Sequence, residues 1–391
     1  MWYVLLALAI LGLITSTGFA AIVLGAVSGY LKERRLALRK MQERPGFTPP
    51  LTLLKPLHGA EPGLEADLES FFQQDYPEFE ILFCARSLDD AGLATARRVA
   101  ARNPEIPVKL LSTGEPGYIN AKVASMEAME AAAAYDILVI SDSDVRVTPD
   151  YLRAVALPFA DPRVGGLTCP YRGVAIEGGL WARLEAVGMS VEMTSGVLAA
   201  RAMEGMQFVL GPTMAFRRQT IHRMGGFRVT ADYCADDFVL GNETYKSGEQ
   251  VVLSHHAIDH MVINSDFLDS MKHQVRWMKS TRFSRPAGHF ATALSFSVPY
   301  GLLALAGASA LGHMRWGLAL LAWSILTREA LAVAVGRGVT GDRSWFGLLV
   351  LYPSRDLMGF VFWAASYWGS RVLWRGRVFE LLPGGKMRAA E

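Results

Sequence analysis

Residues 2–31 form an apolar run without one charged side chain, WYVLLALAILGLITSTGFAAIVLGAVSGYL. A helix needs about 20 apolar residues to cross a bilayer, so this run is long enough to span one. A cleaved signal peptide is the alternative, but its apolar region measures about 7–15 residues and follows a basic stretch. Here the run is longer and the charges follow it. We therefore predict a retained transmembrane helix over residues 1–31.

A basic segment, KERRLALRK, occupies residues 32–40 directly after this run. The positive-inside rule places such a flank in the cytoplasm, and hence the N-terminus outside. The segment could contact anionic lipid headgroups or simply be solvated. With the Pro-rich ERPGFTPP at residues 43–50, it forms a predicted linker over residues 32–50.

Residues 51–285 have the pattern of a water-soluble α/β domain. Short apolar runs such as LTLLKPL, FEILFCA, VKLLS and DILVIS alternate with helical stretches. This alternation is typical of a mainly parallel sheet with helices on both faces. Ligands of such sheets bind outside the carboxyl ends of the strands.

The C-terminal part returns to membrane character over residues 286–370. Apolar runs cover residues 291–312, 316–336 and 345–368; Arg328 and Glu329 interrupt the second, and Pro353, Arg355 and Asp356 the third. Neighbouring charges could form ion pairs with each other, or they could line the path by which an acceptor substrate enters. Three full spans would put the basic tail, residues 371–391, outside, whereas its charges favour the cytosol. We therefore expect a last segment that is re-entrant or doubled, and two to four membrane segments within residues 286–370.

Composition excludes some classes of protein and site. Lys and Arg number 39 against 37 Asp and Glu, so a net charge of +2 gives no case for nucleic-acid binding. The three cysteines, Cys84, Cys169 and Cys234, are widely spaced and odd in number, which supports neither a disulfide framework nor a cysteine zinc site. The histidines at 255, 256 and 260 lack an HExxH pattern, so a structural or acceptor-side role is favoured over zinc.

Two carboxylates follow the apolar run Ile137–Ile140, in the sequence ISDSDV. Asp142 and Asp144 can place oxygen ligands around one hard divalent cation, Mg²⁺ or Mn²⁺, which then neutralises a diphosphate. Strand-end aspartates also cap turns and helices, so this pair alone leaves both interpretations open.

A second carboxylate pair, Asp236 and Asp237, follows the turn-like Gly225-Gly226. A carboxylate beside a metal-bound diphosphate can take the proton from an attacking hydroxyl. One of the pair could instead cap the helix that begins there. Asp236 suits the cap better, and Asp237 suits catalysis.

Basic and aromatic side chains then share one face of a predicted helix at His273, Arg276 and Trp277. Arginine offers a fork of donors for phosphate, and an indole can stack on a sugar or base. An interfacial helix at the membrane surface would use the same residue types.

Together these motifs resemble inverting, metal-dependent glycosyltransferases of the GT-A fold, and more narrowly the ceramide glucosyltransferases of family 21 with their bacterial hopanoid-glycosylating relatives. The resemblance rests on LLKPLHGAEPGLEADLESFFQQDYPEFEILFCARSLDD, SDSDVRV, ADDF, HQVRW and WRGRVFEL. It covers residues 51–285 in detail. One departure is His273, where the family's (Q/R)xxRW element has Gln or Arg.

The resemblance implies further site residues. Asp89 and Asp90 fall where the family has an aspartate that contacts the nucleotide. Asn120 and Lys122, within INAKV, correspond to a family segment near the nucleotide.

We therefore expect a multi-pass protein, in a bacterial inner membrane, with a cytosolic GT-A domain. It would move a sugar, glucose favoured, from a UDP-sugar to a hydroxyl of a ceramide-like lipid. Transfer of N-acetylglucosamine or glucose to a hopanoid, or processive polysaccharide synthesis, are the alternatives. Anchoring suits a lipid acceptor, which cannot diffuse through water.

Overall fold

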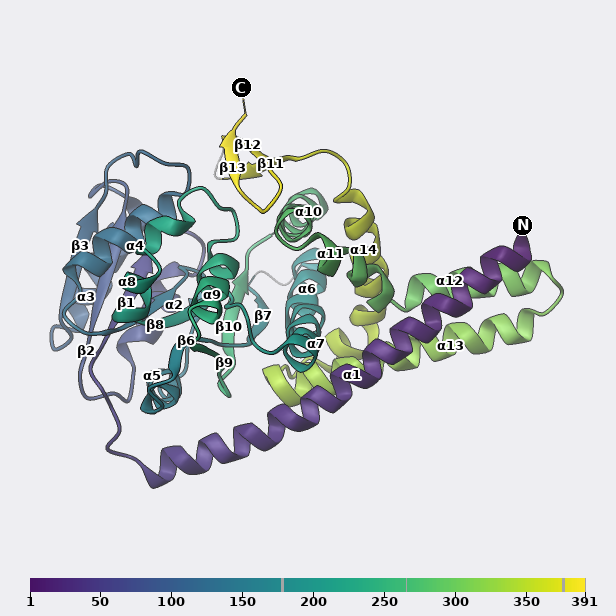
Figure 1. Ribbon diagram of the computed structural model, residues 1–391, viewed down its shortest axis with the longest axis horizontal. Helices are drawn as coiled ribbons and strands as arrows, with labels where there is room; N and C mark the ends of the chain where they lie inside the picture. Colours follow the sequence, from purple (N-terminus) through teal and green to yellow (C-terminus); the bar gives the residue numbers. More distant parts are fainter. Residues whose placement is uncertain (177–178, 265, 375–376, 391) are drawn as a thin grey trace.

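The computed structural model describes residues 1–390 apart from 177–178, 265 and 375–376. The described chain forms an α/β domain, a helical bundle that projects from it, and a small C-terminal sheet (Figure 1). This arrangement confirms the predicted class, an α/β domain with apolar helices on both sides of it in the sequence.

A seven-stranded sheet in the described residues is the centre of the α/β domain, with strand order β3-β2-β1-β4-β8-β6-β9. Neighbours from β3 to β4 are parallel, β8 is antiparallel to β4 and β6, and β9 is parallel to β6. The strands span β1 Leu51–Pro56, β2 Phe79–Ala85, β3 Val108–Ser112, β4 Ile137–Ser141, β6 Val164–Thr168, β8 Thr213–Arg217 and β9 Gln250–Leu253.

Central strands β1, β2 and β4 are buried along their whole length. This explains their near-continuous aliphatic sequences, since both faces of a parallel sheet are covered by helices. Each fully buried Val, Leu or Ile contributes about 1.5–3 kcal/mol, so β4 is firmly held and its end is a rigid platform. The covering helices are α2 Leu64–Phe72, α3 Ala91–Arg102, α4 Ala121–Ala132, α5 Tyr151–Ala156, α8 Arg218–Arg223 and α9 Asp236–Lys246.

A second sheet of three strands, in the order β5-β10-β7, lies beside the carboxyl end of β4. Its strands are β5 Val145–Arg146, β7 Tyr171–Ala175 and β10 Ile258–Val262. Helices α6 Leu180–Val187, η2 Gly188–Met193, α7 Thr194–Glu204 and α10 Phe267–Ser284 connect this region to the bundle.

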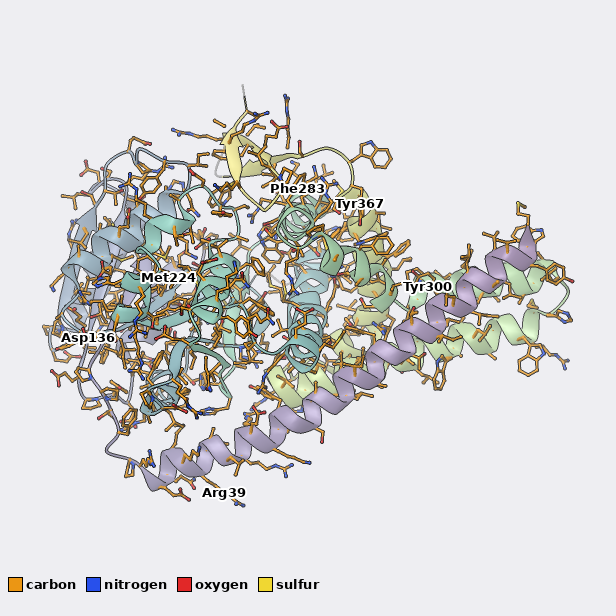
Figure 2. The ribbon with its side chains drawn as sticks, viewed as in Figure 1. Arg39, Asp136, Met224, Phe283, Tyr300 and Tyr367 are labelled. Carbon is orange, nitrogen blue, oxygen red and sulfur yellow. The ribbon has the colours of Figure 1, made fainter. Side chains whose placement is uncertain are left out.

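Helix α1, Trp2–Glu43, is one continuous helix that includes the basic segment assigned from the sequence to a linker. Its N-terminal half lies beside α12, Val298–Ala310, and α13, Met314–Leu331, in the projecting bundle (Figure 1). A Cβ atom on Gly12 of α1 would lie 2.3 Å from the ring of Tyr300, so the glycine permits this close packing (Figure 2). Further along α1, the Tyr30 hydroxyl donates to the Ser254 carbonyl of the α/β domain at 2.9 Å.

Three helices in the described chain are long and apolar enough to cross a membrane: Trp2–Glu43, Met314–Thr340 and Gly347–Ala365. The last comprises η6 Gly347–Leu351 and α14 Tyr352–Ala365, and η5 Ala332–Thr340 continues α13. A fourth candidate is the pair Pro286–Ser295 and Val298–Ala310, which is bent by 52°. The pair contains α11 Pro286–Thr292 and η4 Ala293–Ser295.

The charges within these segments pair between helices rather than with their sequence neighbours. Arg328 of α13 lies 3.3 Å from Asp356 of α14, and both are buried. Arg355 of α14 lies 3.1 Å from Glu192 of η2. The second pair therefore connects α14 directly to the α/β domain.

Both ends of the segment Gly347–Ala365 lie against the α/β domain. At its start, the Cβ position of Gly347 is 3.9 Å from the Val187 side chain, and just beyond its end Arg282 donates to the Gly369 carbonyl at 2.8 Å. Figure 1 shows α14 at a steep angle to α1, between the domain and the projecting bundle.

The tail folds as an antiparallel sheet of β11 Arg371–Trp374, β12 Arg377–Leu381 and β13 Met387–Ala389. It packs on the α/β domain: Met387 N–H donates to the Asp232 carbonyl at 2.6 Å, and Gly384 N–H donates to the Phe283 carbonyl at 3.1 Å. The tail is therefore part of the surface of the α/β domain.

Candidate functional site

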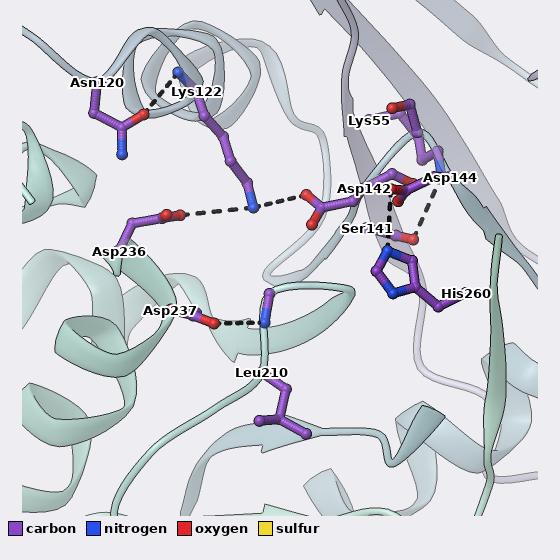
Figure 3. Close-up of polar contacts among 12 residues, drawn as sticks. Lys55, Asn120, Lys122, Ser141, Asp142, Asp144, Leu210, Asp236, Asp237 and His260 are labelled. Carbon is purple, nitrogen blue, oxygen red and sulfur yellow. Dashed lines mark hydrogen bonds and ion pairs between the residues drawn. The ribbon is translucent and has the colours of Figure 1, made fainter. Parts of the chain in front are cut away.

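Asp142 and Asp144 lie at the carboxyl edge of the large sheet, directly after β4 (Figure 3). Strand β5 begins at Val145 and pairs with β10, so the two carboxylates lie in a short connection that is held at both ends. Only Ser143 separates Asp142 from Asp144, so both carboxylates lie near one point at the strand end. The edge where ligands of α/β sheets bind is thus the edge that carries this pair.

Lys122 connects the two carboxylate motifs. It lies in the first turn of α4, and its Nζ is 2.7 Å from Asp142 Oδ1 and 3.6 Å from Asp236 Oδ2 (Figure 3). Burial acts to lower the pKa of Lys122, but Asp142 and Asp236 outweigh it, and the pKa lies above the ordinary lysine value. The lysine is therefore a permanent positive charge between the two motifs.

Two other basic side chains, His260 and Lys55, contact the connection that carries Asp142 and Asp144. The His260 Nε2 atom lies 3.0 Å from Asp144 Oδ2. Beneath the strand end, fully buried Lys55 donates from Nζ to the Asp142 carbonyl at 2.6 Å. Burial lowers the pKa of Lys55 to about 7, although Asp142 and Asp144 act in the opposite direction.

The residues present fit a hard divalent cation. Asp144 Oδ1 is buried and makes no hydrogen bond within the described chain. Mg²⁺ typically takes one or two protein carboxylates and completes its shell with substrate phosphates. Among the described residues no three His, Cys, Asp or Glu side chains converge on one point. Asp142 and Asp144 are the residues that would hold Mg²⁺ or Mn²⁺.

Asp237 faces the same space from α9. Its Oδ2 accepts from Gly211 N–H at 2.8 Å and its Oδ1 from Phe238 N–H at 2.8 Å. A Cβ atom on Gly211 would lie 3.3 Å from Asp237 Oδ2 and 3.5 Å from Asp142 Oδ2. The glycine therefore leaves open a space that both carboxylates face.

The surroundings of Asp237 favour its protonated form. Burial and the neighbouring Asp236 raise its pKa to about 6, against the opposing effects of Lys122 and the two backbone donors. A carboxyl group with a pKa close to physiological pH is suited to general-base catalysis. Asp236, expected to cap α9, is instead the first helical residue and forms no cap hydrogen bond, because its side chain faces Lys122.

Helix α10 carries His273, Arg276 and Trp277 beside this space. Its N-cap is Asp266, which accepts from Asp269 N–H. Arg276 lies close enough to Cys234, two residues before Asp236, to lower the pKa of that thiol, although burial raises it overall. The rings of His273 and Trp277 are 4.3 Å apart, and His273 Nδ1 lies 2.8 Å from Glu185 Oε1.

The residues expected at the nucleotide end lie at helix N-termini. Asp90 caps α3, accepting from Gly92 N–H at 2.8 Å and from Gly59 N–H at 3.0 Å, whereas neighbouring Asp89 is exposed. Asn120 caps α4 and accepts from Lys122 N–H at 3.0 Å. This cap fixes the start of α4, and with it the backbone position from which the Lys122 side chain extends.

The sequence does not reveal the roles of three residues at the site. Glu185 lies within an amphipathic helix and carries no motif, and Lys55 stands out only as part of KPL. The sequence favours a structural or acceptor-side role over zinc for His260, but its pairing with Asp144 requires β10 to lie beside β5. Long-range strand pairing of this kind leaves no local sequence signal.

The sequence comparisons show one family. The sequence pattern of Glycosyl transferase family 21 matches residues 13–387. Ceramide glucosyltransferase 1 of Caenorhabditis elegans is 25% identical over 361 residues, covering 88% of this chain and 74% of that protein. The ceramide glucosyltransferase of Komagataella phaffii is 30% identical over 145 residues, 36% of this chain and 28% of that protein. A solved mannosyltransferase from Pyrobaculum calidifontis aligns with a TM-score of 0.47 at 18% identity, over 88% of this chain and 99% of that one.

Proposed function

Because the chain belongs to glycosyl transferase family 21, and is therefore a glycosyl-transfer enzyme, we propose that it moves a sugar from a UDP-sugar to a membrane lipid with inversion. Glucose is the favoured sugar and a ceramide-like hydroxyl the favoured acceptor, because the named relatives are ceramide glucosyltransferases.

The observation that carries this proposal is the space at Gly211. Asp142 and Asp237 face it from opposite sides, and Lys122 lies within 2.7 Å of Asp142. A donor diphosphate near Asp142 and an acceptor hydroxyl near Asp237 would meet there. Inversion needs one base and a stabilised leaving group, and no enzyme nucleophile.

In the proposed mechanism, Asp237 Oδ2 takes the proton of the attacking lipid hydroxyl. The hydroxyl oxygen forms a bond to the anomeric carbon while the bond from that carbon to the diphosphate breaks, and UDP leaves. Lys122 and Arg276 stabilise the negative charge that develops on the diphosphate. A divalent cation held by Asp142 and Asp144 would neutralise further charge when bound.

Residues at the edge of the site complete the donor pocket in this proposal. Asp89 or Asp90, with Asn120 and Lys122, contacts the uridine end. In this proposal Trp277 of α10 faces the sugar. A stacked indole suits the apolar face of a hexose.

We propose that the projecting bundle reaches the lipid. Residues 1–31 serve as the N-terminal span, 32–50 as a basic connection, 51–285 as the cytosolic catalytic domain, 286–370 as the C-terminal membrane region and 371–391 as a cytosolic tail. In this topology α1, α12 and α13 cross the membrane, and α14 lies at its surface. A bacterial inner membrane is the expected location.

The test uses membranes that contain the protein, labelled UDP-glucose or UDP-N-acetylglucosamine, and either ceramide or a hopanoid. Transfer should require Mg²⁺ or Mn²⁺, cease with EDTA, and fall to background in Asp237→Ala. Asp136→Asn is the matched control, because the side chain of Asp136 is 95% exposed on the far side of the domain (Figure 2).

The outcomes separate the alternatives. A glycosylated hopanoid or a long polysaccharide would replace the ceramide proposal. If no donor gives a glycolipid or polymer, or if Asp237→Ala matches the parent, the proposed function is wrong.

A further inference from the structure

Glu185 is a buried carboxylate that the proposed reaction leaves unexplained. It lies on α6 with its side chain 1% exposed, and it accepts three hydrogen bonds. The donors are His273 Nδ1 at 2.8 Å, Ser270 Oγ at 2.6 Å and Asn264 Nδ2 at 2.8 Å. All three belong to α10 or to the segment just before it, so one carboxylate fixes the start of the helix that carries Arg276 and Trp277.

Within the described residues, His273 is the ionisable side chain that pairs with the Glu185 carboxylate. In the part of the chain that the structure describes, no lysine or arginine lies within 4.0 Å of its carboxylate. Burial acts to raise the pKa of Glu185, but the bonds from His273, Ser270 and Asn264 outweigh it, and the pKa lies below the ordinary value. Burying a carboxylate costs free energy unless its oxygens accept hydrogen bonds, and the three donors offset that cost. The charged Glu185 carboxylate therefore holds the His273 ring in one orientation.

The Glu185 bond determines what His273 offers on its other edge. A ring that donates its Nδ1 proton to a carboxylate keeps, when neutral, an acceptor lone pair at Nε2. The Trp277 ring packs 4.3 Å away at an angle of 51° and restricts rotation of the imidazole. The His273 side chain is 30% exposed, so the far edge is open to a ligand.

Helix α10, which carries His273, packs on α11 and α14 of the C-terminal membrane region. On its other side, Glu185 is close enough to His260, the partner of Asp144, to affect its pKa. The helix of Glu185 continues into η2, where Glu192 pairs with Arg355 of α14 at 3.1 Å. His273 therefore lies on a helix that contacts the region from which a lipid acceptor would come.

We propose that Glu185 is a positioning residue that fixes His273 so that Nε2 accepts a hydrogen bond from the lipid acceptor's second, non-reacting hydroxyl group. The inference rests on the proposed function and adds an acceptor-recognition site to it. Asp237 binds the hydroxyl that reacts, and His273 binds the hydroxyl that does not. Acceptors with two neighbouring hydroxyl groups would be selected over those with one.

The test measures steady-state kinetics in detergent–lipid micelles with UDP-glucose and ceramide. Glu185→Gln replaces the charged acceptor of His273 Nδ1–H with a neutral amide, which no longer fixes the orientation of the ring. It should raise the KM for ceramide about tenfold, the effect of one misplaced hydrogen bond. The KM for UDP-glucose should change less than twofold. His273→Ala should raise the KM for ceramide by the same factor as Glu185→Gln. The double variant should have the same KM as His273→Ala, because Glu185 acts through His273. His273→Gln, which restores an acceptor oxygen, should recover part of the loss.

Two controls decide the interpretation. Glu130→Gln alters a matched pair on the surface, where His222 Nε2 lies 2.9 Å from Glu130 Oε1, and should leave both KM values unchanged. A ceramide analogue without the non-reacting hydroxyl should be a poor substrate for the parent and no poorer for Glu185→Gln.

The inference fails if Glu185→Gln changes both KM values equally, or if the analogue and ceramide respond alike to it. If Glu185→Gln cannot be recovered folded, His273→Ala and the analogue decide alone. A parent that glycosylates no lipid overturns the proposed function instead.

Discussion

Replacing Asp237 with Asn should lower activity about 10²–10⁴-fold and at the same time stabilise the protein at neutral pH. Burial and Asp236 raise the pKa of Asp237 to about 6 from the ordinary 3.8. The folded state therefore disfavours the charged carboxylate, by about 3 kcal/mol at pH 7.5, since each pH unit is worth about 1.4 kcal/mol. Asn removes that cost but loses one acceptor for Gly211 or Phe238, worth about 1 kcal/mol. The expected net gain in unfolding free energy is about 2 kcal/mol.

The sign of the effect depends on pH. For a group whose pKa is raised in the folded state, the cost is absent below pH 3.8, grows between 3.8 and 6, and is constant above 6. The gain of Asp237→Asn should accordingly disappear near pH 4. Urea unfolding of the detergent-solubilised, metal-free protein at pH 4, 5, 6 and 7.5 measures it, with Asp136→Asn as control. A variant that is less stable than the parent at pH 7.5 would refute the reasoning.

Other predictions follow from the same geometry. The kcat/KM of the parent should fall as the pH drops through about 6, where Asp237 becomes protonated, and Asp237→Asn should keep a residual rate about 10²–10⁴-fold lower across this range. Lys122→Met should cost about 3 kcal/mol of stability in urea unfolding, because it leaves the partly buried carboxylates that lie 2.7 and 3.6 Å away without their cation; an unchanged midpoint would contradict this. Gly211→Ala should lower kcat/KM about tenfold or more with the circular dichroism spectrum unchanged, because the new Cβ occupies the space between the two carboxylates. In intact cells, His313→Cys at the turn between α12 and α13 should react with an impermeant maleimide while Ser247→Cys in the α/β domain stays unlabelled; the reverse pattern would invert the proposed topology.

Much of the fold could be predicted from local sequence. The uncharged run at residues 2–31 predicts a helix that is long and apolar enough to cross a membrane, and the structure has one there. The alternation of apolar runs with helical stretches predicts a mainly parallel sheet with Asp142 and Asp144 at a strand end. Both patterns depend on burial along a single element, which the spacing of apolar residues reveals directly.

The chemical partners were decided by contacts between distant segments. His260 reaches Asp144 because β10 pairs with β5, and Lys122 reaches Asp142 and Asp236 because its helix starts at the sheet edge where both motifs lie.

The sequence by itself determined which residues could do chemistry here: the aspartates, the lysine, and the arginine and tryptophan of one helix face. The tertiary structure decided which of them share a space, and added Glu185, which no motif marks. The physical reason is that periodicity and caps act within a few residues, whereas the charge and orientation of a buried group depend on atoms that the fold brings together from far along the chain.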